Sequence, residues 1–398
     1  MKRHLIGIGG VGMSALATAL VRLGDEVTGA DRTLGTPNIA FLESLGVRVY
    51  PDDGSGVDAT VGEVVVSTAI EPDNPGLAKA AALGIPVAHR AKALAGALAG
   101  RKLVAVAGTC GKSTVTAMLG HVLAECGFDP FCVNGANVPG WEGAVRFGAG
   151  EYAVAEVDES DKSLVAFTPY AAVVTNASDD HYSKEEMNAV FDAFVSELPG
   201  PLVDGRTLHG EADVSAPGRH NRNNAFLALR MAVALGCDEK RAAAALGTFR
   251  GVERRLQKYG GNVYDDYAHN PEKLQAMWTA LAGEHPRGIC AVWRPHGYAP
   301  LRKMLGRLAE MFNATVRPCD RLLLLPVYDA GGTADRSINS DALAARLTVG
   351  CECVADADEV CRWCAAHRGE FEAFAVCGAR DPGLPALAER LSAIVAGG

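Results

Sequence analysis

Short apolar runs alternate with stretches of helical periodicity from the N-terminus onward. Residues 5–8 form an apolar run that enters a glycine-rich turn, residues 13–23 follow a helical pattern, and residues 26–30 form the next apolar strand. This order predicts a β-α-β unit. Strand and helix patterns at 64–67 and 75–83 continue it, so residues 1–98 are predicted to form a small, doubly wound parallel sheet.

The same alternation recurs in two later blocks. In the second block, residues 99–253, strands are predicted at 103–107, 152–155 and 171–175 and helices at 115–126 and 225–235. In the third block, residues 254–398, strands are predicted at 263–267, 288–293 and 322–325 and helices at 272–282 and 301–312. The predicted class is α/β with three domains: an N-terminal Rossmann-like parallel sheet, a central P-loop ATPase-like domain and a C-terminal Rossmann-like domain.

Composition narrows the class of protein. The chain has 398 residues, 48% of them hydrophobic and 21% charged, which suits a soluble protein of two or three domains. A net charge of −9 disfavours a nucleic-acid binder, whose phosphate contacts need a basic surface. The first residues form too short an apolar stretch for a signal peptide, and no run reaches membrane-spanning length. We therefore expect a cytoplasmic protein without a membrane partner, either a monomer or a weak homodimer.

Cysteines are numerous for such a protein. There are 11, an odd number spread along the chain, and reduced thiols are the simplest account. Four lie close together, at Cys351, Cys353, Cys361 and Cys364. A zinc site would need four converging ligands, and only His367 is near this group. We expect Cys361 and Cys364 to lie on a helix with at least one of them in the core, and the roles of the four stay open.

The strongest single motif is a glycine loop between a predicted strand and a predicted helix. It comprises Gly108, Thr109, Cys110, Gly111, Lys112, Ser113 and Thr114. Successive N–H groups and a helix N-terminus donate hydrogen bonds to a phosphate chain. Lys112 can reach the outer phosphates, and the Ser113 hydroxyl can bind magnesium. Val106 stands where the usual P-loop has its first glycine, so this is a shortened variant of the loop.

A second glycine turn lies in the first block. Gly7, Gly9 and Gly12 have the spacing of a dinucleotide-binding turn, and Asp31 is near the expected distance for an acid that binds a ribose. Spacing alone predicts a nucleotide diphosphate on the helix N-terminus. It does not distinguish NAD from UDP.

Polar segments follow several of the predicted strands. Acids at 156–161 are placed to hold magnesium beside a P-loop, and residues 175–181 repeat the arrangement after the next strand. Residues 217–224 form a polar turn before an apolar helix, and residues 265–271 follow the first strand of the third block. Because all of them lie at element ends in one chain, they predict a single assembled site.

With these segments in order, the chain resembles the Mur ligases, and within that family the subfamily of UDP-N-acetylmuramate–L-alanine ligases and their murein-peptide ligase relatives. The resemblance spans essentially the whole chain. It rests on the opening Gly-Ile-Gly-Gly-Val-Gly-Met-Ser-Ala turn and on the segments at 66–70, 73–75, 89–91, 108–114, 156–161, 175–181, 217–221, 251–255 and 265–269.

The resemblance implies an ATP- and Mg²⁺-dependent ligase that joins a free amino acid to a UDP-linked sugar acid through an acyl phosphate. Its three domains would bind the UDP-sugar, ATP and the amino acid. The residues implied as catalytic are Lys112, Glu156 and His181, and those implied for the metal are Ser113, Glu156 and His181. ATP would contact Gly108, Thr109, Gly111, Lys112, Ser113, Thr114, His220, Asn221 and Asn224. The UDP-sugar would contact Gly10, Val11, Gly12, Met13, Ser14, Asp31, Ser67, Asn74 and Arg90. The amino acid would contact Tyr267, His269, His296 and Arg302.

The chain departs from the family pattern at three places. Only 36 positions separate His181 from Pro217, so the central domain is shorter than in relatives. The family segment His-His-Pro is His269-Asn270-Pro271 here. The segment Pro-His-Arg-Tyr-Thr-Arg is here Pro295 to Pro300, with Gly297 and Pro300 in place of the arginines. In relatives those arginines help bind the amino-acid carboxylate, a task that suits a guanidinium.

Several hypotheses about the function stay open. The first is a UDP-N-acetylmuramate–L-alanine ligase of peptidoglycan synthesis. The second is a Mur-type ligase with another amine or acid substrate outside the main pathway, which the lost arginines and the short central domain favour. A third is a non-catalytic, nucleotide-gated binding protein on the same scaffold, although Lys112, Glu156 and His181 are present. An oxidoreductase would leave the second glycine loop unexplained.

Overall fold

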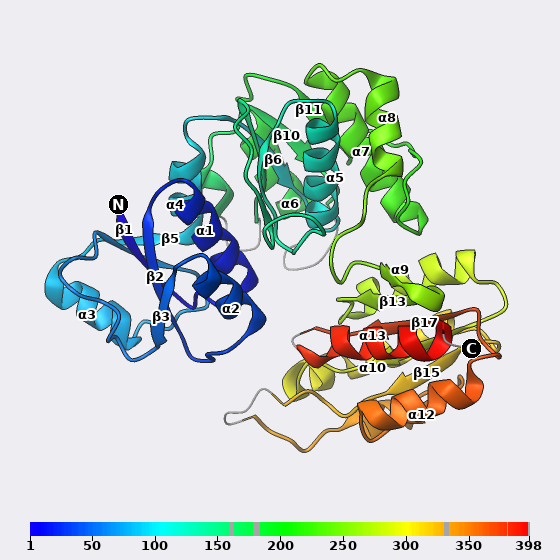
Figure 1. Cartoon of the computed structure of the whole chain (residues 1–398). Helices are drawn as coiled ribbons and strands as arrows, with labels where there is room; N and C mark the ends of the chain where they lie inside the picture. The colour runs from blue at the N-terminus through cyan, green and yellow to red at the C-terminus, as the bar shows by residue number, and fades with distance from the viewer. Residues whose placement is uncertain (159–162, 178–183, 330–333, 380, 397–398) are drawn as a thin grey trace. The chain divides into compact units, whose positions relative to one another are not determined.

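The computed structural model describes residues 1–158, 163–177, 184–329, 334–379 and 381–396 (Figure 1). It contains three sheets, each built mainly of parallel strands and flanked by helices, so the predicted three-domain α/β class is confirmed. By internal contacts the chain divides into two compact units. Unit 1 comprises residues 1–215 and 223–250 and holds the first two sheets, and unit 2 comprises residues 216–222 and 251–398 and holds the third.

The first sheet is parallel, with strand order β3-β2-β1-β4-β5. Its strands are β1 (Lys2–Ile6), β2 (Glu26–Asp31), β3 (Arg48–Pro51), β4 (Glu63–Val66) and β5 (Val87–His89). The helices are α1 (Val11–Arg22), α2 (Pro37–Ser44), α3 (Pro75–Leu83) and α4 (Arg90–Leu98). The strand order reverses between β1 and β4, and in such sheets ligands bind beyond the carboxyl ends of the strands at this point. The first glycine turn follows β1 there.

The second sheet has the order β11-β10-β6-β9-β7-β8, and only β8 pairs antiparallel. Its strands are β6 (Lys102–Ala107), β7 (Phe131–Val133), β8 (Val145–Arg146), β9 (Tyr152–Glu156), β10 (Ala171–Val174) and β11 (Leu202–Asp204). The helices are α5 (Lys112–Glu125), α6 (Lys184–Val195), α7 (Arg219–Ala234) and α8 (Glu239–Gly247), with a 3₁₀ turn η1 (Ser163–Ala166). Helix α7 begins six residues before the predicted start at 225, so the supposed polar turn at 219–224 is helical.

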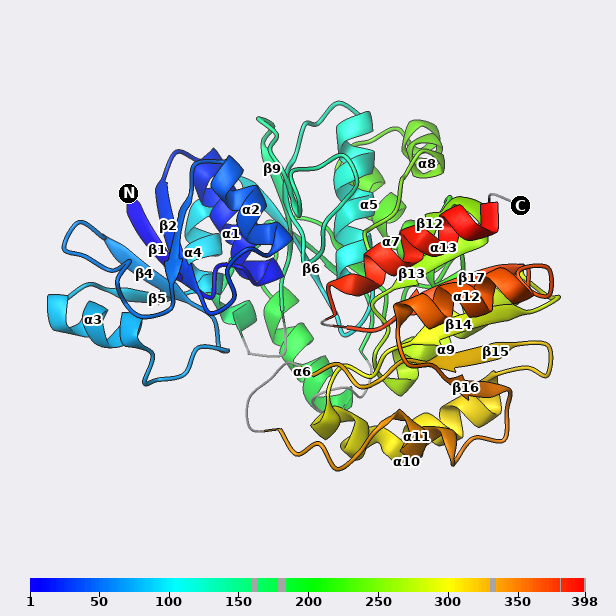
Figure 2. The same ribbon diagram turned by 60° about the horizontal axis from the view of Figure 1, so that its bottom comes forward.

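The third sheet has the order β12-β13-β17-β14-β15-β16, with β12 antiparallel (Figure 2). Its strands are β12 (Gln257–Tyr259), β13 (Val263–Asp266), β14 (Ile289–Trp293), β15 (Arg321–Leu324), β16 (Cys351–Cys353) and β17 (Ala373–Cys377). The helices are α9 (Pro271–Glu284), α10 (Tyr298–Thr315), α11 (Ser340–Ala344), α12 (Ala357–His367) and α13 (Gly383–Ala396), with a 3₁₀ turn η2 (Gly260–Asn262). The central strand β17 was not predicted from the sequence.

Strand β14 shows why these strands are apolar throughout. Successive side chains of a strand point to opposite faces of the sheet. Ile289, Ala291 and Trp293 pack in one core with residues of α9 and α10, whereas Cys290 and Val292 pack in another with residues of α12 and α13. A strand covered by helices on both faces has no position for a polar side chain, which accounts for the continuous apolar runs.

The cysteines of α12 belong to the second of these cores. Cys361 and Cys364 are both buried on α12, as predicted, beside residues of β17 and α13. Among the residues that the structure describes, no group of three or more His, Cys, Asp or Glu side chains is placed to hold a metal ion. The hypothesis of a zinc site at these cysteines therefore gains no support from the described residues. The described helices also include none long and apolar enough to cross a membrane.

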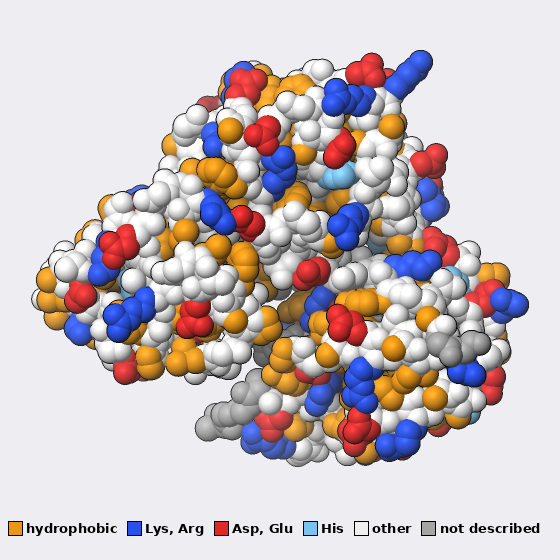
Figure 3. All heavy atoms as spheres, viewed as in Figure 1, with side chains coloured by type: hydrophobic (Ala, Val, Ile, Leu, Met, Phe, Trp, Pro, Cys, Tyr) orange, Lys and Arg blue, Asp and Glu red, His pale blue; other side chains and the backbone are white. Residues whose placement is uncertain are grey.

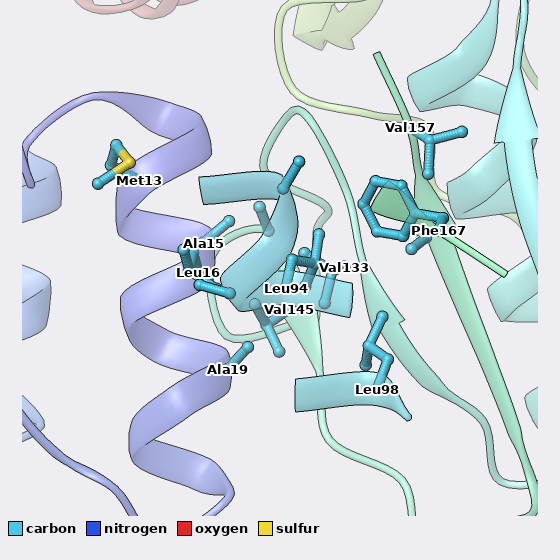
Figure 4. Packing of buried hydrophobic residues seen from close by; sticks show 14 of the residues in the cluster. Met13, Ala15, Leu16, Ala19, Leu94, Leu98, Val133, Val145, Val157 and Phe167 are labelled. Carbon is cyan, nitrogen blue, oxygen red and sulfur yellow. The ribbon is translucent and has the colours of Figure 1, made fainter. Parts of the chain in front are cut away.

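The first two domains share one hydrophobic core (Figure 4). Met13 and Leu16 of α1 and Leu94 of α4 belong to the same buried cluster as Val133, at the end of β7, and Phe167, just after η1. At about 25 cal/mol per Å² of buried apolar surface, such a contact stabilises both domains together. The two sheets of unit 1 are therefore fixed relative to each other.

His4 gives this unit a dependence on pH. It is 1% exposed on β1, its Nδ1 lies 2.9 Å from Thr28 Oγ1, and burial lowers its pKa to about 4. The folded state disfavours the charged ring, so its contribution is complete above pH 6.5 and is lost as pH falls toward 4. We expect unit 1 to lose roughly 3 kcal/mol across this window. His4→Gln should flatten the dependence in denaturant unfolding, whereas His209→Gln, at an exposed site, should leave it unchanged.

Candidate active site

The P-loop follows β6, the central strand of the second sheet. Gly108 has φ +128°, and a Cβ there would lie 2.1 Å from Thr175 Oγ1 and 2.9 Å from Thr175 N. No side chain fits such an approach, so the sequence needs glycine at this position. Gly111 is the N-cap of α5, and Lys112 is the first residue of that helix. The strand, turn and helix predicted from the motif are confirmed.

Two residues after β10 hold this loop in place. Thr109 Oγ1 donates a hydrogen bond to Asn176 Oδ1 (2.6 Å), and the Cys110 amide donates to the same oxygen (3.1 Å). In return, Asn176 Nδ2 and Thr175 Oγ1 both donate to the Cys110 carbonyl, at 2.9 and 2.6 Å. These bonds fix the loop backbone before any ligand binds. The sequence places Thr175 and Asn176 at a strand end but does not reveal that they brace the loop.

The Lys112 side chain folds back onto the P-loop. Its Nζ donates to the Gly108 carbonyl at 2.7 Å, which keeps the ammonium among the loop amides. Ser113 and Thr114 are buried in the first turn of α5. The N-terminus of a helix carries partial positive charge, and together with the lysine it forms an anion site suited to a phosphate chain. The arrangement can bind and polarise the outer phosphates of a nucleotide.

Glu156 ends β9, the strand beside β6. Its Oε2 accepts a hydrogen bond from the Gly135 amide at 2.8 Å, so the loop after β7 fixes this carboxylate. Val106 and Glu156 are partners in the register of the two strands, which brings the acid to the same edge of the sheet as the P-loop. Ser113 and Glu156 supply oxygen ligands of the type that magnesium prefers. His181, the third residue predicted for the metal, lies outside the described residues.

The first glycine turn is held by Asp31. One carboxylate oxygen accepts from the Gly9 amide (2.9 Å), and the other accepts from the Thr33 amide (2.9 Å). Asn38 Nδ2 donates to the Gly9 carbonyl. The spacing predicted a bond from Asp31 to a ribose, and the structure gives the side chain a further task, which is to shape the turn that would receive the diphosphate.

The other residues predicted for the UDP-sugar divide into two groups. Met13 is buried in the shared core, and Asn74 caps α3 and bonds Asp52, so both support the fold. The second group lies closer to the turn. There, Ser14 Oγ donates a hydrogen bond to the backbone carbonyl of Val11, and the Val11 residue is exposed. The remaining predicted positions are Gly10, the N-cap of α1, Gly12 in the first turn of that helix, Ser67 just after β4, and Arg90 at the start of α4.

A small cavity of about 20 Å³ lies where the first two domains meet. Gly12 and Arg90 line it from the first domain, and Glu156 and Asp158 line it from the second. Arg90 Nη2 lies 3.4 Å from Asp158 Oδ2. Residues predicted for the UDP-sugar and for the metal therefore line one cavity of unit 1.

Helix α7 carries three of the residues predicted to contact ATP, His220, Asn221 and Asn224. Asn224 belongs to unit 1, and its Oδ1 lies 2.6 Å from the point that a Cβ on Gly111 would occupy, so its amide covers the P-loop. His220 and Asn221 belong to the segment 216–222 of unit 2. There, Asn221 Nδ2 donates to the Pro217 carbonyl at 2.6 Å.

In the third domain, three of the four residues predicted to contact the amino acid, Tyr267, His269 and His296, form an aromatic group at the carboxyl ends of β13 and β14, and the fourth, Arg302, lies on α10. The rings of His269 and His296 lie 4.9 Å apart, and those of Tyr267 and His269 lie 5.6 Å apart. Asn270 is the N-cap of α9, where its side chain accepts from the Lys273 amide. This capping role suits asparagine at a position where relatives have histidine.

Two family models match the N-terminal and C-terminal parts of the chain. Residues 2–102 match the Mur ligase family catalytic-domain model, and residues 253–380 match the Mur ligase glutamate ligase-domain model. A UDP-N-acetylmuramate–L-alanine ligase of Arthrobacter sp. (strain FB24) is 35% identical, with 90% of this chain and 88% of the relative covered. The chain belongs to the Mur ligase family. It is thus an ATP-dependent ligase, and the resemblance read from its motifs is confirmed.

Solved structures of this family share the fold. The UDP-N-acetylmuramate–alanine ligase of Thermotoga maritima matches with a TM-score of 0.80 at 24% identity, covering 98% of both chains. A murein peptide ligase of Psychrobacter arcticus matches with a TM-score of 0.67 at 20% identity, covering 100% of this chain and 99% of that one. Both likenesses concern the fold, which this Mur ligase keeps along its whole length.

The P-loop geometry yields a direct prediction for Lys112. Lys112→Ala should lower ATP-dependent phosphate release by about 10³-fold, because the developing phosphate charge loses its nearest cation. Lys102→Ala removes the same charge from the opposite end of β6 and should leave the rate near that of the parent. Thermal unfolding would confirm that both variants fold. A folded Lys112→Ala variant with normal phosphate release would refute the assignment of the loop.

Proposed function

We propose that this Mur ligase joins an amino acid, with L-alanine as first choice, to the carboxylate of UDP-N-acetylmuramate at the expense of ATP. One observation carries the proposal: the glycine turn suited to a UDP-sugar and the P-loop suited to ATP lie in one compact unit with a shared core, and residues of both domains line one cavity. The named relatives support the choice of substrates, since they are UDP-N-acetylmuramate–L-alanine ligases.

The reaction would proceed in two steps. The sugar carboxylate attacks the γ-phosphorus of ATP, ADP leaves, and an acyl phosphate forms. The amine then attacks the acyl carbon, a C–N bond forms, the C–O bond to phosphate breaks, and the amine loses a proton. Lys112 would stabilise charge on the transferred phosphoryl group, and the backbone amides of the P-loop would fix its position. Glu156, Ser113 and His181 would hold Mg²⁺, which neutralises phosphate charge when bound.

A screen for phosphate release tests this function. The enzyme is incubated with ATP, Mg²⁺, UDP-N-acetylmuramate and each amino acid in turn. Phosphate release that needs both the UDP-sugar and an amino acid supports the proposal, and mass spectrometry of the product identifies the amide. ATP turnover with neither acceptor, or none with any amine, would contradict it. Growth of a strain depleted of its own alanine-adding ligase then separates the main pathway from a side pathway.

The segment proposed to bind the amino acid favours a second candidate function, a Mur-type ligase for another amine. Gly297 and Pro300 stand where the motif comparison expects arginines. The nearby Arg294 is held by Asp381 (2.6 Å), and Arg302 is held by Asp335 (2.8 Å). A guanidinium committed to a neighbouring carboxylate is less available for a substrate carboxylate. We therefore expect a high KM for L-alanine, or a preference for an amine without a free α-carboxylate.

Substitution at position 300 tests that interpretation. Gly297 has φ +157°, so the third residue of α10, Pro300, is the better place for an arginine. Pro300→Arg should lower the KM for L-alanine by at least about tenfold, since one charge-assisted hydrogen bond contributes about 1.5–3 kcal/mol. Ala299→Arg, on the exposed neighbouring position, is the control. A micromolar KM for L-alanine in the unaltered enzyme would mean that other groups bind the carboxylate.

The first glycine turn can be tested separately from the P-loop. A Cβ on Gly12 would lie 3.3 Å from Arg90 Nη1, so Gly12→Asp would pair a carboxylate with that guanidinium and repel the diphosphate. We expect at least about a hundredfold loss of UDP-sugar affinity by calorimetry, with ATP binding retained. Gly96→Asp adds the same charge on the exposed side of α4, where a Cβ meets nothing within 4 Å, and should bind normally. Unchanged affinity in Gly12→Asp would assign the turn another purpose.

A further inference from the structure

An ion pair bridges the two segments that flank the first glycine turn. Arg32 follows the last residue of β2, and Glu71 lies in the loop between β4 and α3. Arg32 Nη1 and Nη2 donate to the two carboxylate oxygens of Glu71, at 3.2 and 2.6 Å. Because β1 lies between β2 and β4 in the sheet, the pair crosses the carboxyl end of β1, where the turn begins.

Both ends of this bridge adjoin the turn. The residue before the arginine is Asp31, whose carboxylate accepts a hydrogen bond from the Gly9 amide at 2.9 Å. The residue before the glutamate is Ile70, whose Cδ1 lies 3.1 Å from the point that a Cβ on Gly7 would occupy. The guanidinium therefore stands at the rim of the turn proposed for the diphosphate.

A second carboxylate, Asp52, holds the base of the Arg32 side chain. Its Oδ2 accepts from Arg32 Nε at 3.3 Å, and Asn74 Nδ2 donates to both of its oxygens, at 2.9 and 3.1 Å. The side chain of Asp52 is 8% exposed, whereas those of Arg32 and Glu71 are 65% and 51% exposed. The contact with Asp52 is thus the buried end of the network, and the contact with Glu71 is the open end.

The open end can exchange its partner easily. The hydrogen bond from Arg32 lowers the pKa of Glu71, so the glutamate is ionised at neutral pH. Water and salt screen an exposed ion pair, and such a pair opens at small cost. A phosphate group offers a guanidinium the same two-oxygen geometry with more negative charge. An anion at the N-terminus of α1 can therefore replace the glutamate.

We propose that Arg32 is a further binding residue for the diphosphate of the sugar nucleotide, and that Glu71 competes with the phosphate for its guanidinium. The inference rests on the proposed function and adds a charged rim to the glycine turn. Asp52 keeps the arginine beside the turn while the partner changes. Glu71 thereby holds the affinity for the sugar nucleotide below the value that the turn and Arg32 would reach without it.

Calorimetry with UDP on the full chain tests this exchange. Arg32→Gln should weaken UDP binding at least about fivefold, and Arg32→Lys, which keeps the charge without the fork, should lie between that variant and the parent. Glu71→Gln should strengthen UDP binding about two- to fivefold. Unchanged binding by Arg32→Gln overturns the contact with phosphate. Unchanged or weaker binding by Glu71→Gln overturns the competition and leaves the pair a structural strap.

The double variant separates competition from simple repulsion. When Arg32 is already glutamine, Glu71→Gln has no guanidinium to release, so it should change the affinity for UDP much less than it does in the parent. An equal gain in both backgrounds would mean that Glu71 acts only by repelling the phosphate, which contradicts the proposal. Thermal unfolding confirms that each variant folds.

Glu142→Gln is the matched control. Glu142 binds Arg22 through two nitrogens, both at 2.6 Å, at the end of α1 away from the glycine turn. The variant removes one carboxylate from an exposed bidentate pair in the same unit and should leave UDP affinity unchanged. A gain as large as that of Glu71→Gln would reveal a general effect of net charge and contradict the role of Glu71.

The two proposals can fail separately. Phosphate release decides the proposed function, and UDP binding decides the role of Arg32. A parent that binds UDP, with the expected order of variants, but does not use UDP-N-acetylmuramate refutes the proposed function alone. A parent that uses UDP-N-acetylmuramate while Arg32→Gln binds UDP normally refutes the role of Arg32 alone. A parent that binds no UDP contradicts the role of Arg32.

Discussion

The parallel register of β6 between β9 and β10 is the constraint on which the candidate site depends. Val106 pairs with Glu156, and Ala107 pairs with Val174, so the three strands end at one edge of the sheet. That edge brings together a glycine loop, an acid and the two residues that brace the loop. A shift by one residue would turn every side chain of a strand to the other face, so the register is held by how these buried side chains pack on each face of the sheet.

The first domain adds a second glycine turn, the proposed site of the diphosphate, to the same compact unit. Its glycine turn is shaped by the Asp31 carboxylate, and its helices α1 and α4 pack on the second domain through apolar side chains. The acidic and basic side chains that remain are interspersed on the face seen in Figure 3. The positive charges proposed to meet phosphate groups are therefore local ones, at the P-loop and at Arg32, within a protein of net charge −9.

Much of this could be predicted from local signals. A strand that ends in glycines and enters a helix locates both glycine loops, and the structure confirms their strand–turn–helix geometry, since these features are contiguous in the sequence. The central strand β17 was missed because a run of five apolar residues, Ala373–Cys377, is also typical of a buried helix segment. The start of α7 was placed too late because Asn221 and Asn224 favour turns and caps over helix interiors.

Other features depend on contacts between distant residues. Neither the brace of Asn176 on the P-loop nor the approach of Asp158 to Arg90 follows from spacing, because each joins segments more than sixty positions apart. The same holds for Asp31. Its position in the sequence predicts a role near a nucleotide, and only the folded turn shows that backbone amides already bind both of its oxygens.

The core shared by the first two domains limits how this enzyme can change in evolution. Leu16 and Leu94 pack with Val133 and Phe167, so a first domain exchanged by recombination must bring an apolar surface that fits the recipient. Among the described residues, the third domain packs around cores of its own. Under the division of roles that the family resemblance implies, a change of amine is a change in the C-terminal domain, whereas the parts for the sugar nucleotide and ATP share one core and must change together.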